Sequence, residues 1–407
     1  MCSIFGWKGK ISKKEKKYIL KNANIRGRDG YGVLADNTIL RGLGKMTKKH
    51  IDKIINSKNV VGNFRATPTT ETQSRIDNLQ PYKGIVHNGV IANDKEIGNY
   101  EIDSMVLPDI LLKQGTIEDK LNKIVGSYAL AWQENKKLYL ANNYKPIYYC
   151  LNNKGICFAS IPEMLYNKAY KLEPYSYAIY YNTKLKTKKL YRKENNSCVV
   201  ACSSGLDSTT VAYYLKNKGY NVSLVHFKYN CNAEKLEIDR TKKISKHGKF
   251  NLSIIEMPNV MKGTITKGEY HKNGVEGTEF AMDWVSGRNL LMLSILTAYA
   301  ESKNISNIAF GGNLEESGAY PDNEQEFGRM FNNILPYATQ NGVKINLLQP
   351  LSTLMKHEII KLGRENNVPY ELSWSCYSGK KKHCGKCGPC FMRKTAFQRN
   401  GLKDPAL

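Results

Sequence analysis

Residues 203–208 read Ser-Ser-Gly-Leu-Asp-Ser, a short segment that combines hydroxyl groups, a glycine and a carboxylate. An apolar run at residues 198–202 predicts a buried strand before it, and apolar residues at helical spacing in 210–218 predict a helix after it. Free backbone N–H groups and the helix dipole at a helix N-terminus favour a phosphate anion. The Gly-Lys-Ser/Thr ending of a Walker loop is missing. The segment therefore indicates a phosphate site of another kind, although a Ser/Gly turn at a strand–helix junction is often only a turn.

Four cysteines lie close together near the C-terminus, in an arrangement that contains two Cys-x-x-Cys steps. They are Cys376, Cys384, Cys387 and Cys390. In an intracellular chain this spacing is typical of tetrahedral zinc coordination rather than of disulfides. Four thiolates leave no open coordination position, so we expect one structural Zn²⁺ per chain that stabilises the tail. His383 is a rival ligand, but four cysteines already complete the site.

A third candidate is Cys2, because removal of Met1 would leave a cysteine with a free α-amine. That amine has a pKa near 8 and can act as the base for the thiol of the same residue. A lone Cys2 would more simply be a structural residue. It is accompanied, however, by four polar blocks at residues 25–32, 62–67, 86–91 and 101–104.

In this order and spacing, Cys2 and the four blocks resemble the glutaminase domain of class II glutamine amidotransferases, over about residues 2–190. The resemblance implies an αββα N-terminal-nucleophile hydrolase fold that releases ammonia from L-glutamine. It implies that Cys2 is the nucleophile and that the Asn88 side chain and the Gly89 N–H stabilise the oxyanion. The implied glutamine-binding residues are Arg65 for the α-carboxylate, Asp103 for the α-ammonium group and Arg26 near the nucleophile. The block at 62–67 begins Gly-Asn-Phe, where the family more often has Gly-His-Thr.

These groups require two sets of elements to position them. Strands alternate with helices after about residue 197, which predicts a doubly wound parallel sheet that binds ligands at the carboxyl ends of its strands. In the first half, residues 126–132 and 138–141 alternate like core strands. The polar, lysine-rich stretch at 182–196 is the best linker candidate. We therefore expect one domain at residues 1–193 and a second at 194–407.

The composition sets further limits. The 407 residues suffice for two or three domains, and 41% hydrophobic content suits a globular protein. The longest apolar run, near residues 290–300, is too short to span a membrane, so we expect a cytoplasmic protein with no membrane partner. The net charge of +25 indicates either a nucleic-acid partner or solvated basic faces. A homo-oligomer stays open, since the sequence does not reveal oligomeric state.

The second half resembles ATP pyrophosphatases and, among them, the 7-cyano-7-deazaguanine synthase family, over about residues 197–400. The motifs that carry the resemblance are the segment at 203–208, Arg288-Asn289, Tyr320-Pro321-Asp322, Lys356, Ser-Cys-Tyr and the Cys-Gly-x-Cys-x-x-Cys tail. Ser204 stands where the family has Gly, and Asn230-Cys231 stands where relatives carry Gly-Gln after the tyrosine.

The resemblance also assigns residues to ligands, with Mg²⁺ near Asp207. The implied ATP-binding residues are Ser203, Ser204, Gly205, Leu206, Asp207, Ser208 and Lys356. The implied substrate-binding residues are Tyr229, Arg288, Asn289, Gly311, Asn313, Tyr320 and Asp322.

Together the two resemblances imply an ATP-dependent glutamine amidotransferase of 7-deazaguanine metabolism. ATP would adenylate a 7-carboxy-7-deazaguanine, glutamine-derived ammonia would displace AMP to give the amide, and a second adenylation would lead to the 7-cyano base. A fused glutaminase supplies unprotonated ammonia near its acceptor. Two alternatives stay open. One is archaeosine-type amidination of 7-cyano-7-deazaguanine already in tRNA or DNA, and the other is a non-catalytic deazaguanine- or partner-binding protein.

Overall fold

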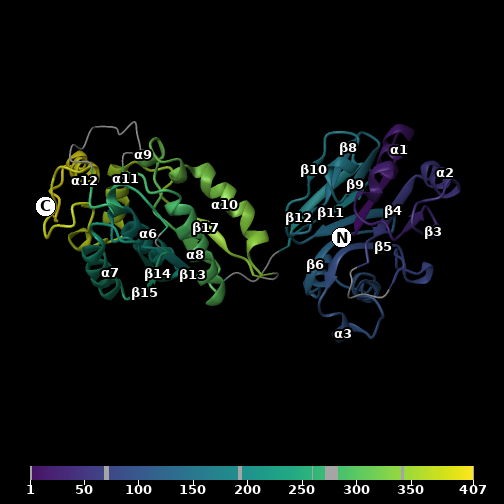
Figure 1. Ribbon diagram of the computed structural model, residues 1–407, viewed down its shortest axis with the longest axis horizontal. Helices are drawn as coiled ribbons and strands as arrows, with labels where there is room; N and C mark the ends of the chain where they lie inside the picture. Colours follow the sequence, from purple (N-terminus) through teal and green to yellow (C-terminus); the bar gives the residue numbers. More distant parts are fainter. Residues whose placement is uncertain are drawn as a thin grey trace. The chain divides into compact units, whose positions relative to one another are not determined.

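The computed structural model describes residues 2–67, 73–190, 195–258, 260–270, 283–340 and 343–406. The chain divides into two compact units, Met1–Arg192 and Lys193–Leu407 (Figure 1). Each unit has its own sheets and cores, and each is described here by itself.

The N-terminal unit contains two antiparallel sheets. The first has the order β10 (Tyr170–Lys171), β8 (Tyr148–Asn152), β9 (Gly155–Ala159), β1 (Ser3–Gly9), β4 (Asn59–Arg65), β2 (Gly30–Ala35) and β3 (Thr38–Leu43). The second has the order β12 (Lys184–Lys189), β11 (Ser176–Tyr181), β7 (Lys137–Asn142), β6 (Gly126–Glu134) and β5 (Ile85–Ile91).

Alternating side chains on these strands build three cores. In β1, Ile4 belongs to the core between the sheets, whereas Phe5 packs with helices α1 (Lys13–Asn22) and α2 (Lys48–Asn56). In β6, Ala129 lies in the core between the sheets, and Leu130 packs with α4 (Leu107–Leu111) and α5 (Ile117–Asn122). Because successive side chains of a strand point to opposite faces, each sheet buries both faces. The unit therefore has helix–sheet–sheet–helix layers, which confirms the predicted αββα fold.

The predicted linker at residues 182–196 is wrong in its first part, because Lys184–Lys189 form strand β12 at the edge of the second sheet. Asn182 and Thr183 have φ values of 48° and 61°, as a two-residue hairpin turn requires. Leu185 packs against the core between the sheets, and exposed lysines on the edge strand hinder pairing with another chain. The boundary predicted between domains 1–193 and 194–407 falls in residues 191–194, outside the described residues, and stays a prediction.

The C-terminal unit is built on one parallel sheet, which confirms the predicted doubly wound fold. Its strand order is β15 (Asn251–Glu256), β14 (Asn221–Lys228), β13 (Ser197–Ala201), β16 (Asn307–Ala309) and β17 (Asn346–Leu348). One face packs against α6 (Leu206–Asn217), α7 (Glu234–Gly248), α11 (Lys356–Glu365) and α12 (Gly388–Arg399). The other face packs against α8 (Arg288–Ser302) and α10 (Gln325–Ala338).

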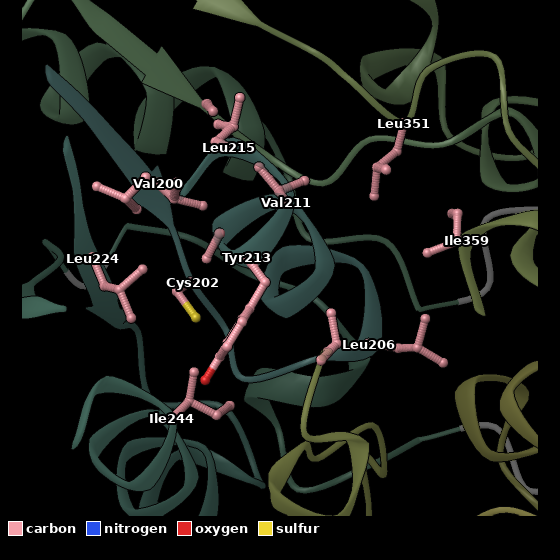
Figure 2. Packing of buried hydrophobic residues seen from close by; sticks show 14 of the residues in the cluster. Val200, Cys202, Leu206, Val211, Tyr213, Leu215, Leu224, Ile244, Leu351 and Ile359 are labelled. Carbon is pink, nitrogen blue, oxygen red and sulfur yellow. The ribbon is translucent and has the colours of Figure 1, made fainter. Parts of the chain in front are cut away.

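Strand β13 is buried on both faces, as expected for a central parallel strand. Val200 belongs to the core that contains α6, and Val199 to the core that contains α8. Figure 2 shows part of the first core, with Val200 and Leu224 from the sheet and Val211 from α6. The strand order reverses between β13 and β16, so the loops that follow these strands open a crevice at the carboxyl edge.

Helix α6 begins at Leu206, four residues before the predicted start at residue 210. Gly205 occupies the N-cap, and the hydroxyl groups of Thr209 and Thr210 donate to the carbonyl oxygens four residues earlier, at 2.7 and 2.8 Å. These bonds let hydroxyl residues enter the first turn. The loop before α6 therefore consists of residues 202–205 only.

Short helical segments complete the two units. They are α3 (Asp94–Ile97), α9 (Leu314–Ser317), η1 (Ala23–Ile25), η2 (Ile76–Asn78), η3 (Asp103–Val106), η4 (Pro162–Met164), η5 (Thr264–Thr266), η6 (Pro321–Asn323) and η7 (Tyr370–Leu372). Across the described ranges, every helix is too short or too polar to cross a membrane.

Candidate active sites in the two units

Cys2 lies directly before β1, at the end of β4. Its Sγ is 3.5 Å from the backbone nitrogen of Ala66 and 3.7 Å from the carbonyl oxygen of the same residue. The register pairs Ser3 with Phe64, so Cys2 is a ladder neighbour of Arg65. Arg65 is 6% exposed, and its Nη1 donates to the carbonyl oxygen of Asn78 at 3.2 Å. The structure thus brings the predicted nucleophile and the predicted carboxylate-binding cation together.

Asn63 links the strand of Cys2 to the strand of Asn88. Its Nδ2 donates to the carbonyl oxygens of Ser3 at 3.2 Å and His87 at 3.1 Å. Ser3 follows Cys2, and His87 precedes Asn88, so one buried amide spans the two sheets beside the nucleophile. Sequence reasoning noted Asn63 only as a departure from the family motif. A side chain with two N–H donors suits this bridge, because each carbonyl needs one donor.

The predicted oxyanion site has an unused donor. Asn88 is 3% exposed, and its Nδ2 has no hydrogen-bond partner among the described residues. An unpaired buried donor costs about 1–3 kcal/mol, so it indicates a position that a ligand oxygen completes. At Gly89, which has φ 155°, a Cβ atom would lie 1.9 Å from the carbonyl oxygen of Ser127. Only glycine fits there, and the two predicted donors are consecutive residues in the middle of β5.

Asp103 contacts β5, which carries Asn88, and Arg26 lies next to a glycine that packs against β4. The carboxylate of Asp103 accepts hydrogen bonds from the backbone N–H groups of Ile91, at 2.7 Å, and Ser104, at 2.6 Å. Ile91 is the last residue of β5, which places the carboxylate close to the Asn88 strand. Arg26 is half-buried and precedes Gly27, where a Cβ atom would lie 2.5 Å from the carbonyl oxygen of Phe64 on β4.

In the C-terminal unit, the carboxyl edge of the sheet opens into a cavity of about 210 Å³. Its walls come from the loops after β13, β14 and β16, from the start of α8 and α11, and from the tail. The predicted ligand-binding residues that line it are Ser203, Gly205, Leu206, Asp207, Ser208, Tyr229, Arg288, Asn289, Gly311 and Lys356. The predicted residues that do not line it are Ser204, Asn313, Tyr320 and Asp322. The crevice expected from the strand order is thus the place where most of the predicted set meets.

The loop before α6 is held by its own hydroxyl groups. Ser208 Oγ accepts from the Ser203 backbone N–H at 3.2 Å and lies 3.3 Å from Ser203 Oγ. Ser204 has φ 62°, is fully buried, and its Oγ has no partner in the described ranges. A Cβ atom at Gly311 would lie 2.9 Å from the Ser208 nitrogen, so the loop after β16 closes tightly over the helix start. The N-terminus of α6 therefore faces the cavity.

Lys356, which begins α11, forms the charged centre of this end of the cavity. It is 7% exposed and pairs with the carboxylate of Asp207 and, at 2.7 Å, with that of Glu316. Burial raises the pKa of Asp207 to about 6 against the opposing charge of Lys356. Burial also acts to lower the pKa of Lys356, but the two carboxylates outweigh it and raise that pKa. The amine thus stays protonated at neutral pH.

The same cluster fits a magnesium-bound phosphate. Oδ1 of Asp207 has no partner among the described residues, which leaves a carboxylate oxygen available. Carboxylate oxygens are the ligands that Mg²⁺ prefers, and a buried amine beside a helix N-terminus suits a phosphate group. Glu316 was not predicted from the sequence, and its proximity to Lys356 depends on the turn of α9.

The four cysteines of the tail form one cluster. Their Sγ atoms all lie within 4.8 Å of one another, and those of Cys384 and Cys390 are 4.0 Å apart. Tetrahedral coordination with Zn–S distances near 2.3 Å requires sulfur atoms about 3.8 Å apart. Backbone N–H groups of Cys384 and Ser378 lie 3.3 and 3.4 Å from Cys376 Sγ, as suits a thiolate. The residues present therefore fit a metal ion.

The tail also contacts the loop at residues 202–205. The backbone N–H of Trp374 donates to the carbonyl oxygen of Ser204 at 2.8 Å. Arg393, 1% exposed on α12, binds Asp404 through two bonds of 2.7 and 2.9 Å and donates to Ser373 Oγ at 2.7 Å. Arg393 lies one turn after Cys390, so it joins the cysteine cluster to the residues on either side of Trp374. Sequence reasoning missed this connection.

Two buried cavity residues were also missed. His226 on β14 is 1% exposed, its Nδ1 lies 2.9 Å from the Cys202 carbonyl oxygen, and its Nε2 has no described partner. Because a carbonyl only accepts, Nδ1 carries the proton and Nε2 is an acceptor. Glu237 on α7 is 8% exposed and lines the same cavity. The apolar residues around His226 in β14 and the helical spacing of α7 gave no sign that these two residues line a cavity.

Comparisons with known proteins match both units. A glutamine amidotransferase domain family matches residues 66–167, and the family described as queuosine biosynthesis protein QueC matches residues 197–401. The chain is 40% identical to 7-cyano-7-deazaguanine synthase 2 of Sulfurisphaera tokodaii, over 100% of this chain and 99% of the relative. It is 38% identical to the 7-cyano-7-deazaguanine synthase of Sulfolobus acidocaldarius, with the same coverage. The synthase of Picrophilus torridus is 37% identical over 51% of this chain and 89% of its own length, so such relatives also occur at about half this length.

Proposed function

The chain belongs to the 7-cyano-7-deazaguanine synthase family, and from this premise we propose that it converts 7-carboxy-7-deazaguanine into the 7-amido and then the 7-cyano base. The reaction uses ATP and ammonia from L-glutamine. The observation that carries the proposal is the cavity in which Lys356, Asp207 and Glu316 gather at the N-terminus of α6. That arrangement suits phosphate transfer chemistry more than simple base binding, because a non-catalytic pocket has no need of a buried amine with two carboxylates.

In the N-terminal unit, Cys2 attacks the side-chain amide carbon of glutamine. The Asn88 amide and the Gly89 N–H stabilise the oxyanion, and the unpaired Nδ2 of Asn88 supports this role. Arg65 binds the α-carboxylate of glutamine and Asp103 binds its α-ammonium group. Arg26 contributes to glutamine binding near the nucleophile. Water then hydrolyses the thioester and regenerates the thiol, so that one glutamine gives glutamate and one ammonia.

In the C-terminal unit, the 7-carboxylate attacks the α-phosphate of ATP and displaces pyrophosphate. The backbone N–H groups at the start of α6, the hydroxyl groups of Ser203 and Ser208, and Lys356 hold the phosphates. Mg²⁺ held by Asp207 would neutralise negative charge on the phosphates. Ammonia displaces AMP from the acyl adenylate to give the amide. A second adenylation, now at the amide oxygen, gives the nitrile when AMP leaves with loss of two N–H protons.

Binding of the base falls to the remaining predicted residues. We assign this role to Tyr229, Arg288, Asn289 and Gly311, which line the cavity, and a supporting role outside its lining to Asn313, Tyr320 and Asp322. The backbone of Ser204, Gly205 and Leu206 is assigned to the nucleotide. We further propose that the metal of the cysteine cluster is one structural Zn²⁺ per chain, since four thiolates are its common closed site. The domains are proposed to be residues 1–193 and 194–407.

Incubation with glutamine, ATP, Mg²⁺ and 7-carboxy-7-deazaguanine tests the proposal. The expected result is formation of AMP together with product masses of the amide and the nitrile. Cys2→Ala is expected to abolish the glutamine-driven reaction but to keep turnover with added ammonium salt, because only the ammonia source is removed. Absence of both AMP and a new mass would refute the proposal. Turnover of a cyano-bearing tRNA or DNA without ATP would replace it with amidination.

A further inference from the structure

Glu237 is a buried carboxylate that receives few hydrogen bonds and no ion pair from the described residues of the enzyme. It lies on α7, is 8% exposed and lines the cavity of the C-terminal unit. Its hydrogen-bond partner is the thiol of Cys231, whose Sγ lies 3.8 Å from Oε2. A thiol is a weak donor. Within the described ranges no lysine or arginine forms an ion pair with Glu237, in contrast to Asp207 and Glu316, which share Lys356.

This environment is unfavourable for the ionised side chain. Burial raises the pKa of Glu237 to about 7, and the charge of Arg288 only partly opposes the shift. A buried carboxylate with only one weak donor destabilises the fold, and such groups concentrate where a ligand completes their hydrogen bonds. The cavity lining therefore holds two chemically distinct groups, the amine of Lys356 with its two carboxylates and the carboxylate of Glu237 with one weak thiol donor.

The lining of the cavity that contains Glu237 suits a flat aromatic ligand. Side chains of Phe227, Phe310, Trp374 and Tyr377 line the same cavity. Aromatic walls favour a planar base by stacking. A carboxylate can accept two parallel N–H bonds from adjacent donors. The pyrimidine edge of a deazaguanine presents such a pair, a ring N–H and the adjacent exocyclic amino group.

Adenine presents a different edge, in which the amino group lies beside a ring nitrogen that accepts. That lone pair would face the second carboxylate oxygen, so the same contact would be repulsive. We propose that Glu237 accepts hydrogen bonds from the ring N–H and the 2-amino group of the base substrate and thereby selects a 2-amino-4-oxopyrimidine edge. This inference rests on the proposed function, because it assigns a specificity residue to the substrate of that reaction.

Equilibrium binding with two ligands tests the inference. The ligands are 7-carboxy-7-deazaguanine and its analogue in which hydrogen replaces the 2-amino group. The wild-type enzyme is expected to prefer the amino compound by roughly 10–100-fold, as for a hydrogen bond to a charged group. Glu237→Gln is expected to remove most of this preference, because one acceptor oxygen becomes an NH₂ group that opposes the donor. Its affinity for ATP is expected to stay unchanged.

Asp239→Asn is the matched control, since Asp239 is exposed on the same helix and the charge change is the same. This variant is expected to keep the full preference. If the wild-type enzyme binds neither base, the proposed function fails. If the wild-type enzyme binds the bases but shows no preference, the inference on Glu237 is overturned while the proposed function stands. The same conclusion follows if Glu237→Gln retains the preference, or if it weakens ATP binding as much as base binding.

A second variant covers the case in which Glu237→Gln does not fold, as judged by its thermal melt. Glu237→Asp keeps the charge but withdraws the carboxylate by one methylene group. It is expected to weaken binding of the 2-amino base more than binding of the analogue. Equal weakening of both ligands would contradict the assigned contact.

Discussion

Replacing Ser204 with glycine is expected to stabilise the C-terminal unit, although it removes a buried side chain. Ser204 has φ 62°, and its fully buried hydroxyl has no partner among the described residues. A left-handed backbone costs an L-residue roughly 1 kcal/mol, and an unpaired buried hydroxyl about 1–3 kcal/mol. Glycine loses about 0.5–1 kcal/mol more to unfolded-chain entropy, besides some packing. The expected net gain in the free energy of unfolding is about 1–2 kcal/mol.

Thermal unfolding followed by circular dichroism or calorimetry measures this gain. For a unit of this size, the transition of the C-terminal unit is expected to rise by about 2–8 °C. Ser204→Ala removes the hydroxyl but keeps the left-handed backbone, and its gain should be of similar size, because the backbone strain that glycine relieves and the entropy that glycine costs nearly cancel. Lys249→Gly is a matched control for the backbone alone, since Lys249 has φ 51° and is exposed at the C-cap of α7. Its effect is expected to stay within about 1 kcal/mol.

A lower melting temperature for both Ser204 variants would refute this reasoning, because it would mean that the hydroxyl forms a stabilising hydrogen bond. ATP affinity gives a second check. Ser204 does not line the cavity, so both variants are expected to bind ATP as the wild type does. A loss of affinity in Ser204→Ala would instead mean that the hydroxyl contacts the nucleotide.

Three further predictions concern other parts of the chain. Asn88→Ala is expected to lower kcat for glutamine hydrolysis by about 10²–10³-fold with little change in KM, measured by glutamate release, and an unchanged kcat would exclude the oxyanion role. Cys384→Ser is expected to reduce the metal content below one ion per chain and to lower the melting temperature, and full metal content by elemental analysis would contradict the four-cysteine site. The raised pKa of Glu237 means that its contribution to folding is present below pH 4.5 and is lost as the pH rises through 7. Glu237→Gln removes this titration. The free energy of unfolding of the variant, measured by denaturant titration relative to wild type, should therefore increase by about 3 kcal/mol from pH 4.5 to pH 8. A difference that stays constant over this range would argue against the raised pKa.

Local patterns predicted much of the C-terminal unit. The apolar run at 198–202 became β13, one residue earlier, because a central parallel strand needs apolar residues on both faces. The spacing of the four cysteines predicted their cluster, since two Cys-x-x-Cys steps bring sulfur atoms close without long-range contacts. The strand β12 was missed because the pairing of a lysine-rich segment depends on β11 and on one inward leucine rather than on its own composition.

In the candidate sites too, residues in local motifs could be predicted, whereas residues that depend on contacts distant in the chain could not. Residues in short motifs, such as Asp207, were recognisable, but their roles remain predictions until they are tested. Asn63 could be seen only as an unusual motif residue, because its two acceptors lie on other strands. Glu316 and Glu237 could not be found at all from the sequence. Each is one acidic residue among many, and its significance arises from burial beside elements that are distant in the chain.

The hydrogen bond from Trp374 to the Ser204 carbonyl has a consequence for biogenesis. The loop at residues 202–205 emerges from the ribosome long before Trp374 does, and Asp404, which anchors Arg393, follows later still. A nascent or truncated chain therefore contains the strand, loop and helix without the contact that fixes them. The conformation of this loop therefore depends on the folding of the tail, including the cysteine cluster to which Arg393 is joined through α12.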